Sequence, residues 1–551
     1  MTEAVASVGS DTPKAGERVR FENPTEIASI LVLVGVFFAI LMGAMDGLVV
    51  ATVLPTIAVD LHQVNGVTFV AGAYLISSTI AIPIFARLSD IASRRNVFLA
   101  GLAVFIGGSA LAGISQNLTQ LIIFRGIQGI GGGGVFPVAI AMIAVLYPPK
   151  IRARVTGVLT GAAGLAIVIG PLVGSYIVSV TTWRWVFYIN LPFGILAMVV
   201  LLFAVGPLRP LTKGGFDIPG AALLSGWVGA LMVALVEVSD AGMGWTNPLI
   251  VGLLGGAVVL FAVFLWLELR TREPLVPLRL MGQRIIAATS GIMFFSGIVF
   301  NALITFLSVF VGIVLLQSGP NATSDVRDII YFLAIPLILG AAVSGQILTR
   351  VAYRNVIAPG LALASVAAFF LTQLTSSTPL WVLSFGFLPV GGLVLPLIPL
   401  GFGLGFSLAG PTIAVQNEAP PKEVGAAIGL TRFLQSLGGA LGISLLTAFE
   451  TWRLSVLSAG ATTPAAIKAA QVATYDDIFL ILAVCVVISF GFSLLFTGRV
   501  PQTPAEDKER PPDPSGVPAP VPDGAVGPPP STAASDSTSG NETGGAEQGP
   551  R

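Results

Sequence analysis

Asp46 is the residue of this chain whose position most strongly suggests chemistry. It lies in the run 28–57, which contains no other charged side chain. A run of that length and composition crosses a bilayer, where an ionisable group is costly and is retained when it has a function or a partner. The sequence therefore predicts a titratable carboxylate buried inside a membrane.

Arg125 is the only charged residue of a second apolar run, 118–146. A helical rise of about 1.5 Å per residue places it at a depth similar to that of Asp46, so the two groups are expected to face one cavity. The arginine favours the ionised carboxylate and the apolar surroundings favour the protonated acid, which is what proton coupling requires. A permanent ion pair that holds the two helices together is the open alternative.

Gln128 and Gly129 follow Arg125 at spacings of three and four residues, so all three share one face of a helix. The glycines that follow leave a groove against a neighbouring helix, and because no strand precedes them they do not suit a nucleotide-binding loop. For Arg432, in the second half of the chain, a contact with an anionic substrate and a bond to a backbone carbonyl both stay open. The residues expected in a substrate cavity are Asp46, Arg125, Gln128 and Arg432.

The composition is that of a protein embedded in lipid. Of 551 residues 54% are hydrophobic and 10% are charged, and the mean hydropathy is +0.89, whereas soluble domains carry about 25% charged residues. The net charge is zero and no basic cluster is present, which argues against nucleic acid as a partner. One histidine, His62, and one cysteine, Cys485, form no metal-ligand set, and neither a metal nor a cofactor is expected.

Apolar windows long enough to cross a bilayer predict fourteen transmembrane helices, and hence an all-α integral membrane protein. The segment 376–390 either extends the twelfth helix or lies at the membrane interface. An even number of helices places both termini on one side. The predicted spans are 28–57, 66–86, 97–115, 118–146, 154–180, 185–206, 216–238, 247–267, 285–316, 327–352, 355–374, 390–416, 422–448 and 476–498.

The distribution of Lys and Arg predicts on which side of the membrane the two termini lie. Twenty-two of the 28 basic residues fall in the tails and in the loops on the side of the termini, and the opposite loops hold only Arg184, Arg327, Arg453 and Lys468. Because cytoplasmic loops are enriched in basic residues, both termini are assigned to the cytoplasm. We expect a monomer in the cell membrane, in contact with its lipid.

A weak internal repeat predicts how the spans are grouped. The basic connection Ala86–Arg95 after the second span resembles Gly345–Arg354 after the tenth, as in transporters built from two six-helix halves. Beyond Arg499 the chain is rich in Pro, Gly and Ser and has too few large apolar residues to fold. The predicted organisation is a cytoplasmic segment 1–27, a six-helix bundle 28–206, an inserted helix pair 207–284, a six-helix bundle 285–498 and a disordered cytoplasmic tail 499–551.

Six motifs follow one another along the chain: Asp46-Gly-Leu-Val-Val-Ala-Thr-Val-Leu-Pro55, Ala86 to Arg95, Arg125-Gly-Ile-Gln-Gly129, Gly164 with Gly170-Pro171-Leu-Val-Gly174, Trp183 to Pro192, and Arg272 to Pro277. In this order they resemble the motifs of the major facilitator superfamily. Within it they are similar to those of the fourteen-helix drug:proton antiporters, over nearly all of residues 28–498. The resemblance implies that Asp46, beside Arg125, couples transport to protons.

The resemblance also implies residues that control the conformational cycle. Asp90, with Arg94 and Arg95, is expected to lie near the start of the thirteenth span, where the positive end of a helix can hold a conformational lock. Ile91 stands where the family has an arginine, and Ala86 and Ser93 where it has glycines, so this lock has one charge fewer.

The fifth span is the second place where the resemblance implies gating. It assigns that role to Gly164, Gly170, Pro171 and Gly174, although Ser175 replaces a common glycine. From the residues alone, a hinge at the proline and a packing kink are equally open.

The function that these features favour is transport. The leading hypothesis is a proton-coupled antiporter that exports hydrophobic or amphipathic, cationic small molecules by alternating access of the two bundles. Its expected partners are a small-molecule substrate and protons, and no enzymatic activity is expected. The alternatives are an exporter of one physiological lipid or metabolite, and a non-transporting membrane sensor or scaffold.

Overall fold

The computed structural model describes residues 27–62, 69–206, 208, 210, 214–240, 244–311, 322–373, 383–385, 388–390, 394–420, 423–459 and 463–496. The predicted cytoplasmic segment before Ile27 and the predicted tail 499–551 lie outside these residues.

The described residues are almost entirely helical, as the sequence predicts. Thirteen of their helices are long and apolar enough to cross a membrane. The fifth predicted span lies in α6, which is not among the thirteen, so the count of fourteen stays a prediction. The helices up to the predicted insertion are α2 (Ile27–Asp60), α3 (Phe69–Ile91), α4 (Arg94–Gly113), α5 (Leu118–Leu146), α6 (Pro149–Val180), α7 (Trp185–Tyr188) and α8 (Asn190–Ala204), which we call the first half.

The rest of the chain continues in the same manner. The predicted inserted pair corresponds to α9 (Ile218–Asp240) and α10 (Pro248–Glu268), and the short 3-10 helix η1 (Leu278–Gly282) follows. The second half consists of α11 (Arg284–Val309), α12 (Ala322–Ile347), α13 (Tyr353–Leu371), α14 (Val394–Glu418), α15 (Val424–Leu457) and α16 (Pro464–Ser493). A two-stranded antiparallel hairpin, β1 (Leu383–Phe385) with β2 (Leu388–Val390), precedes α14, so the described residues of the segment 376–390 do not extend the twelfth helix.

The largest difference from the predicted spans is at the turn between α15 and α16. The sequence predicts helices ending at 448 and beginning at 476, whereas α15 continues to Leu457 and α16 begins at Pro464. The extension of α15 carries Arg453, a charge that apolar windows exclude, and its Nε pairs with Asp477 of α16 at 2.7 Å. The Thr463 hydroxyl then caps the first turn of α16 by accepting from the Ala466 N–H at 3.3 Å.

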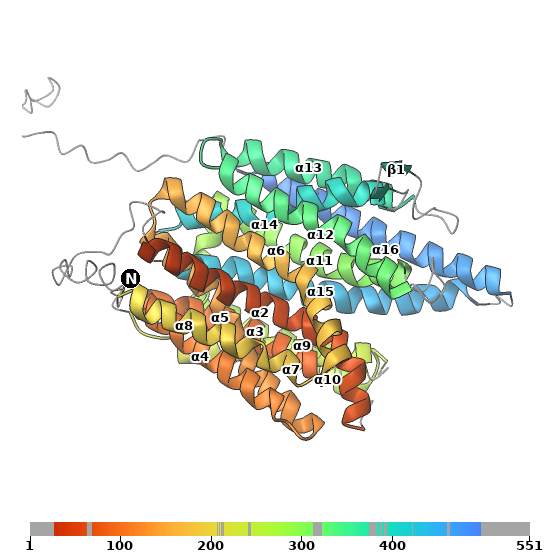
Figure 1. Cartoon of the computed structure of the whole chain (residues 1–551), viewed down its shortest axis with the longest axis horizontal. Coiled ribbons are helices and arrows are strands. Elements are labelled where there is room, and N and C mark those ends of the chain that lie inside the picture. Colours follow the sequence, from red (N-terminus) through yellow and green to blue (C-terminus); the bar gives the residue numbers. More distant parts are fainter. Residues whose placement is uncertain are drawn as a thin grey trace, which may run out of the picture. The chain divides into compact units, whose positions relative to one another are not determined.

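The helices lie side by side, as Figure 1 shows. Within the first half α5 packs between α3 and α4, and α8 packs on α2 and α4. Within the second half α14 packs between α12 and α13, and α16 packs on α11 and α13. The two halves meet where α3 contacts α15 and where α6 contacts α12.

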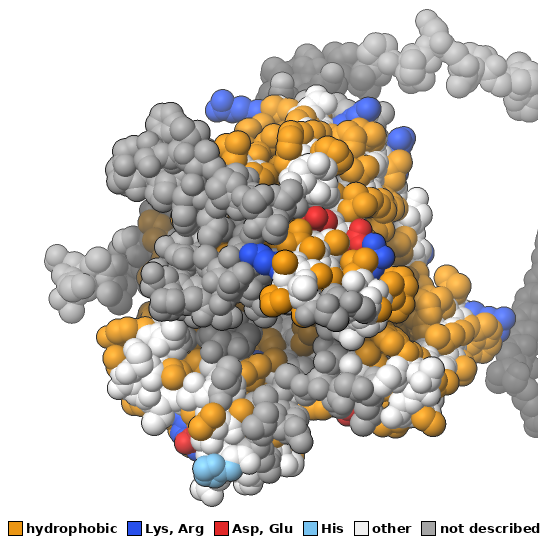
Figure 2. Space-filling model, turned by 90° about the vertical axis from the view of Figure 1, so that its right-hand side faces the viewer, with side chains coloured by type: hydrophobic (Ala, Val, Ile, Leu, Met, Phe, Trp, Pro, Cys, Tyr) orange, Lys and Arg blue, Asp and Glu red, His pale blue; other side chains and the backbone are white. Residues whose placement is uncertain are grey.

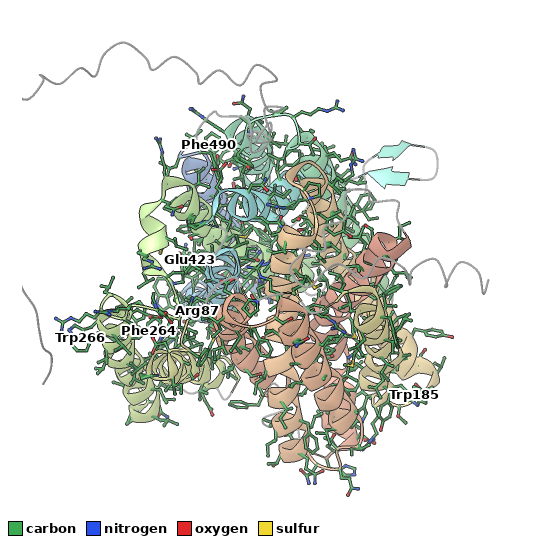
Figure 3. All side chains as sticks on the ribbon, turned by 90° about the vertical axis from the view of Figure 1, so that its left-hand side faces the viewer. Arg87, Trp185, Phe264, Trp266, Glu423 and Phe490 are labelled. Carbon is green, nitrogen blue, oxygen red and sulfur yellow. The ribbon has the colours of Figure 1, made fainter. Side chains whose placement is uncertain are left out.

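The outward faces are apolar, as a lipid environment requires. Figure 2 views the end of the molecule at which His62 lies and shows apolar side chains over much of the described surface, with few charged ones. In Figure 3, which views the molecule from its other end, Trp185 and Trp266 project outward on opposite edges, and they are 55% and 54% exposed. Exposed aromatic side chains of this kind are typical of membrane-facing helices.

The inserted pair is attached to both halves by its connecting loop. Glu268, only 3% exposed at the end of α10, accepts hydrogen bonds from the N–H groups of Leu275 (3.2 Å) and Val276 (2.7 Å) and so fixes that loop. Glu273 then pairs with Arg87 of α3 at 3.5 Å, and Arg279 pairs with Glu423 at the start of α15. Both contacts lie beside the junction of α3 with α15.

The backbones of the two halves approach closely at Gly345 of α12, where a Cβ atom would lie 2.9 Å from the Cα of Gly157 on α6. We expect Gly345→Val to force these helices apart and to destabilise the protein by about 1–3 kcal/mol, because overpacking a close contact shifts the backbone. Gly107→Val on α4, where nothing lies within 4 Å, is the matched control. Thermal unfolding of the purified variants would check this, and equal melting temperatures for the two would contradict it.

Candidate functional site

Asp46 is the centre of a buried polar network in the first half. Its carboxylate forms an ion pair with Nη1 of Arg125, and the two side chains are completely buried. The other oxygen, Oδ1, accepts hydrogen bonds from Nε2 of Gln128 at 2.8 Å and from Nδ2 of Asn190 at 2.9 Å. Helix α2 thus supplies the carboxylate, and α5 and α8 supply its donors.

Arg125 is held in a defined orientation by groups of several helices. Nη1 also donates to Oε1 of Gln128 at 2.8 Å, and Nε donates to the carbonyl of Val70 at 3.2 Å. The guanidinium carbon lies 4.3 Å from the centre of the Tyr74 ring and 5.7 Å from that of Phe187. Nη2 is buried, and no described residue forms a hydrogen bond with it. Aromatic faces stabilise a desolvated cation, so these rings help to hold the charged guanidinium in place. Its Nη2 group remains available to bind a further acceptor.

The structure adds Asn190 and Ser109 to the site, and the sequence analysis gave a role to neither. The Ser109 hydroxyl accepts from both Gln128 Nε2 and Asn190 Nδ2 at 3.1 Å and donates to the carbonyl of Phe187 at 2.9 Å. Asn190 lies in the predicted motif Trp183 to Pro192, which was the one signal that could have indicated it. Small polar residues near the end of a span carry little information by themselves.

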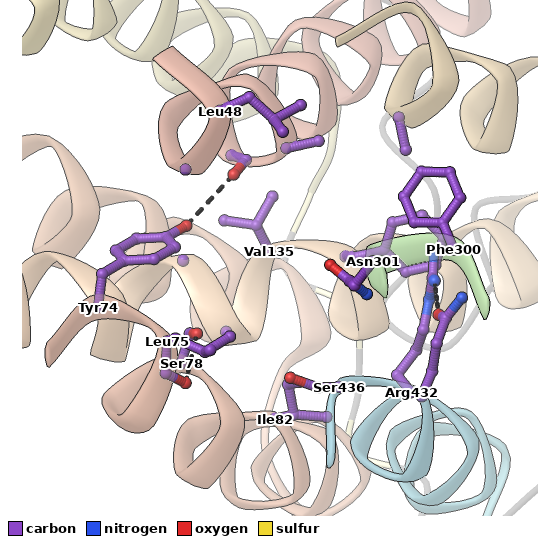
Figure 4. Close-up of a pocket in the computed structure, with 18 of the residues that line it drawn as sticks. Leu48, Tyr74, Leu75, Ser78, Ile82, Val135, Phe300, Asn301, Arg432 and Ser436 are labelled. Atoms are coloured by element: carbon purple, nitrogen blue, oxygen red, sulfur yellow. Dashed lines mark hydrogen bonds between the residues drawn. The ribbon is translucent and has the colours of Figure 1, made fainter. Parts of the chain in front are cut away.

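A cavity of about 540 Å³ lies between the two halves (Figure 4). Arg125 and Arg432 line it, whereas Asp46 and Gln128 do not and lie behind Arg125. Of the four residues expected in a substrate cavity, the structure therefore brings two to its wall and two to the network behind it. Further lining residues are Leu48, Tyr74, Ser78, Phe136, Thr160, Gly164, Phe300, Asn301, Leu408, Gln435 and Ser436.

Arg432 enters this cavity from α15 without a carboxylate partner among the described residues. Its Nη1 donates to Oε1 of Gln435, and its guanidinium carbon lies 3.3 Å from the centre of the Phe136 ring on α5. Its Nε atom is buried and has no hydrogen-bond partner among the residues that the structure describes. Of the two interactions that the sequence left open, a backbone carbonyl is not among its contacts. Figure 4 shows Arg432 beside Phe300 and Asn301.

Asp90 lies at the start of α15, where the resemblance had placed it. Its Oδ1 and Oδ2 accept hydrogen bonds from the N–H groups of Gly425 at 3.0 Å and Ala426 at 2.7 Å. Arg94 Nη2 donates to Oδ1 at 2.8 Å. Glu423, the residue before α15, makes no capping hydrogen bond with its own side chain. Asp90 therefore caps α15 from the other half, which satisfies N–H groups that a helix leaves unpaired.

The other predicted gating residues contact either helices of the first half or a helix of the second half. Arg95 Nη2 donates to the carbonyl of Leu202 on α8 at 2.7 Å and does not reach α15. A Cβ atom at Gly164 would lie 2.8 Å from Ile338 of α12, and one at Gly170 would lie 3.0 Å from Leu48 of α2. Gly174 is buried. The side chain of Pro171 lies outside the described residues, and so does the prediction that it bends the helix.

Polar contacts join the halves at the end where α2 begins. Gln416 of α14 donates from Nε2 to the carbonyl of Ile140 at 2.9 Å, and its Oε1 accepts from the hydroxyl of Thr156 at 2.8 Å. Arg152 Nη1 donates to the carbonyl of Gln416 and to Oδ1 of Asn417, both at 3.2 Å. With the capping of α15, these contacts close the protein at the end that is predicted to be cytoplasmic.

Comparison with known proteins gives consistent results. A family model described as Major Facilitator Superfamily matches residues 36–443. Multidrug transporter protein MdtP of Bacillus subtilis (strain 168) is 33% identical over 419 residues, which are 76% of this chain and 74% of the relative. Multidrug resistance protein 3 of the same organism is 34% identical over 426 residues, 76% of this chain and 79% of the relative.

A solved structure adds support for the fold. The human organic anion transporter MFSD10 aligns with a TM-score of 0.53 at 16% identity, covering 83% of this chain and 99% of that one. A likeness at this level of identity concerns the arrangement of helices alone.

Proposed function

This chain belongs to the major facilitator superfamily, and from that membership we propose that it is a proton-coupled exporter of hydrophobic or amphipathic small molecules. It is a multi-pass membrane transporter and not an enzyme. Export is proposed because the two Bacillus subtilis relatives are named for multidrug transport and resistance. The place proposed for it is the cell membrane, with both termini in the cytoplasm.

One observation carries the coupling to protons: Asp46 is buried and paired with Arg125, and Arg125 lines the cavity. Protonation of Asp46 leaves the charge of Arg125 uncompensated at the cavity wall, and an apolar or cationic ligand packed against that wall disfavours an uncompensated positive charge. Ligand binding and protonation of Asp46 therefore oppose each other, as exchange of substrate for a proton requires. Binding and protonation are linked in this way without direct contact between substrate and Asp46.

The conformational cycle is proposed to be a rocking of the first half, 28–206, against the second half, 285–498. The contacts of Asp90 with α15 and of Gln416 with α5 and α6 would hold one end closed and would break when that end opens. Protonation of Asp46 acts on this equilibrium through Arg125 and the α3 carbonyl that it binds.

Two alternatives are separated from the proposal by flux measurements. Purified protein in proteoliposomes is expected to accumulate the neutral fluorophore phenylnaphthylamine or the cation ethidium when the interior is acidic, and to lose most of that accumulation when a protonophore removes the gradient. Accumulation of a lipid or metabolite but of neither dye would favour the physiological exporter. An absence of gradient-driven flux for every compound would contradict the proposal and favour a sensor or scaffold.

A further inference from the structure

We propose that the central cavity is built for amphipathic molecules with an anionic group, and that Arg432 binds that group. This inference rests on the proposed function, because it assigns a substrate class to the same cavity. It replaces the cationic substrates expected from the sequence.

The charged residues on the cavity wall favour an anionic ligand. Arg125 and Arg432 are its charged residues, and no Asp or Glu is among the described residues that line it. Arg125 is neutralised by Asp46, whereas no carboxylate in the described part of the chain lies within ion-pair distance of Arg432. The wall therefore carries one uncompensated positive charge, which attracts an anion and repels a cation in a medium of low dielectric constant.

Arg432 is also held ready for a ligand. The ring of Phe136 lies against its guanidinium, and Gln435 accepts from Nη1, so the planar group is fixed before any ligand arrives. Its buried Nε has no partner in the described part of the chain, and a buried donor without a partner is costly. A carboxylate, sulfonate or phosphate can accept two parallel N–H bonds from a guanidinium, which removes that cost.

A second group without a partner faces the same cavity from the other half. Thr160 of α6 is 2% exposed and lines the cavity, and within the described ranges its buried hydroxyl has no hydrogen-bond partner. Arg432 and Thr160 thus leave donors unpaired on α15 and α6, which belong to different halves. A polar ligand that bonds to either group satisfies a donor that the protein leaves unsatisfied.

The rest of the wall suits the apolar body of such a molecule. Leu48, Phe300, Ile304 and Leu408 line it, and pockets of about 300–1,000 Å³ accommodate small organic ligands, a range that includes the 540 Å³ found here. An anion seated at Arg432 forms a locally neutral pair. It therefore does not act on Asp46 as an uncompensated negative charge would, and proton exchange at Asp46 remains available.

Three probes test the substrate class: anilinonaphthalene sulfonate, which is an anion; phenylnaphthylamine, the corresponding ring system without the sulfonate; and the cation ethidium. Equilibrium binding to the protein in nanodiscs is measured without a proton gradient. Arg432→Gln is expected to weaken binding of the sulfonate by about 10- to 100-fold, as for loss of a hydrogen bond to a charged group, and to change binding of the neutral probe far less. Arg432→Lys, which keeps the charge and loses the planar fork, is expected to lie between.

The matched control is Arg270→Gln, which removes an exposed guanidinium that lies 4.4 Å from the centre of the Trp266 ring, outside the cavity. It is expected to leave all three affinities unchanged. Preferential binding of ethidium over the sulfonate, or sulfonate binding that is unchanged in Arg432→Gln, would overturn the assignment.

The same proteoliposomes separate this inference from the proposed function. If the sulfonate binds through Arg432 but a pH gradient drives no flux of any probe, the transport proposal fails and the anion site stands. If the gradient drives the neutral and cationic probes while Arg432→Gln alters neither binding nor flux of the sulfonate, transport stands and the anion site fails. Exchange of one proton inward for one monovalent anion outward moves two positive charges inward, so an interior-negative potential is expected to accelerate sulfonate export.

Discussion

Asp46→Asn is expected to reduce proton-driven transport to the level of protein-free vesicles and to destabilise the protein by about 3 to 5 kcal/mol, the usual cost of breaking a buried ion pair. Both oxygens of Asp46 accept from donors of Arg125, Gln128 and Asn190. An asparagine amide can offer one oxygen to these three donors and brings an N–H₂ group that opposes them. It also leaves Arg125 buried with its charge uncompensated.

The control for carboxylate loss is Asp60→Asn on the same helix. Asp60 is outside the apolar part of α2 and bonds to Trp183 Nε1 at 2.8 Å and Arg184 Nη1 at 3.1 Å, which lower the pKa of its carboxyl group. A depressed pKa means that this stabilisation is present at neutral pH and is lost as the pH falls through the folded-state value. The pair is half exposed, and surface pairs contribute about 0–1 kcal/mol, so transport should be nearly unchanged.

The double variant Asp46→Asn/Arg125→Gln decides between proton coupling and a static ion pair. It removes both buried charges, so the melting temperature should recover most of the loss seen in Asp46→Asn. Proton-driven flux should remain absent, because the titratable group is gone. Recovery of both stability and flux in the double variant would show that the pair is structural and would remove Asp46 from the coupling mechanism.

Much of the fold could be predicted from the sequence because lipid imposes simple rules on length and polarity. An all-helical membrane protein of the major facilitator superfamily is confirmed. The ends of α15 and α16 could not be predicted, since apolar windows stop at charges. There Arg453 pairs with Asp477 and Tyr475 bonds to Glu450 across the two helices, so the helices continue where a search for apolar residues ends.

The sequence predicts those site residues that are charged or polar within an otherwise apolar run. Asp46 and Arg125 are conspicuous in apolar runs, and Gln128 follows by helical spacing. Ser109 and Asn190 have no such contrast, and their role depends on how α4 and α8 pack against α2 and α5. The uncompensated charge on the cavity wall is likewise a tertiary property, since sequence alone does not tell which arginine has a carboxylate neighbour.

Asp90→Asn is expected to open the end that is closed in this structure. The carboxylate of Asp90 accepts two N–H groups of α15 and pairs with Arg94, and an amide oxygen cannot serve all three donors. The loss of charge-assisted hydrogen bonds is worth about 1.5 to 3 kcal/mol, which corresponds to a shift of about 10- to 100-fold in the equilibrium between closed and open states. The transport rate should fall by about 10-fold or more, because each transport cycle requires each end of the protein to close in turn.

Cysteine labelling measures this opening directly. Cys485 is the only cysteine, so Cys485→Ser with Thr156→Cys gives a single thiol at a buried position between α6 and α14. Asp90→Asn should raise its rate of reaction with maleimide about tenfold or more. Glu423→Gln, which removes a carboxylate from the same end of α15 but only breaks a pair with the 60% exposed Arg279, should leave the rate nearly unchanged because such pairs contribute little. Equal labelling in both variants would mean that the capping of α15 by Asp90 does not hold this end closed, and that role would fall to the contacts of Gln416 and Arg152 between the halves.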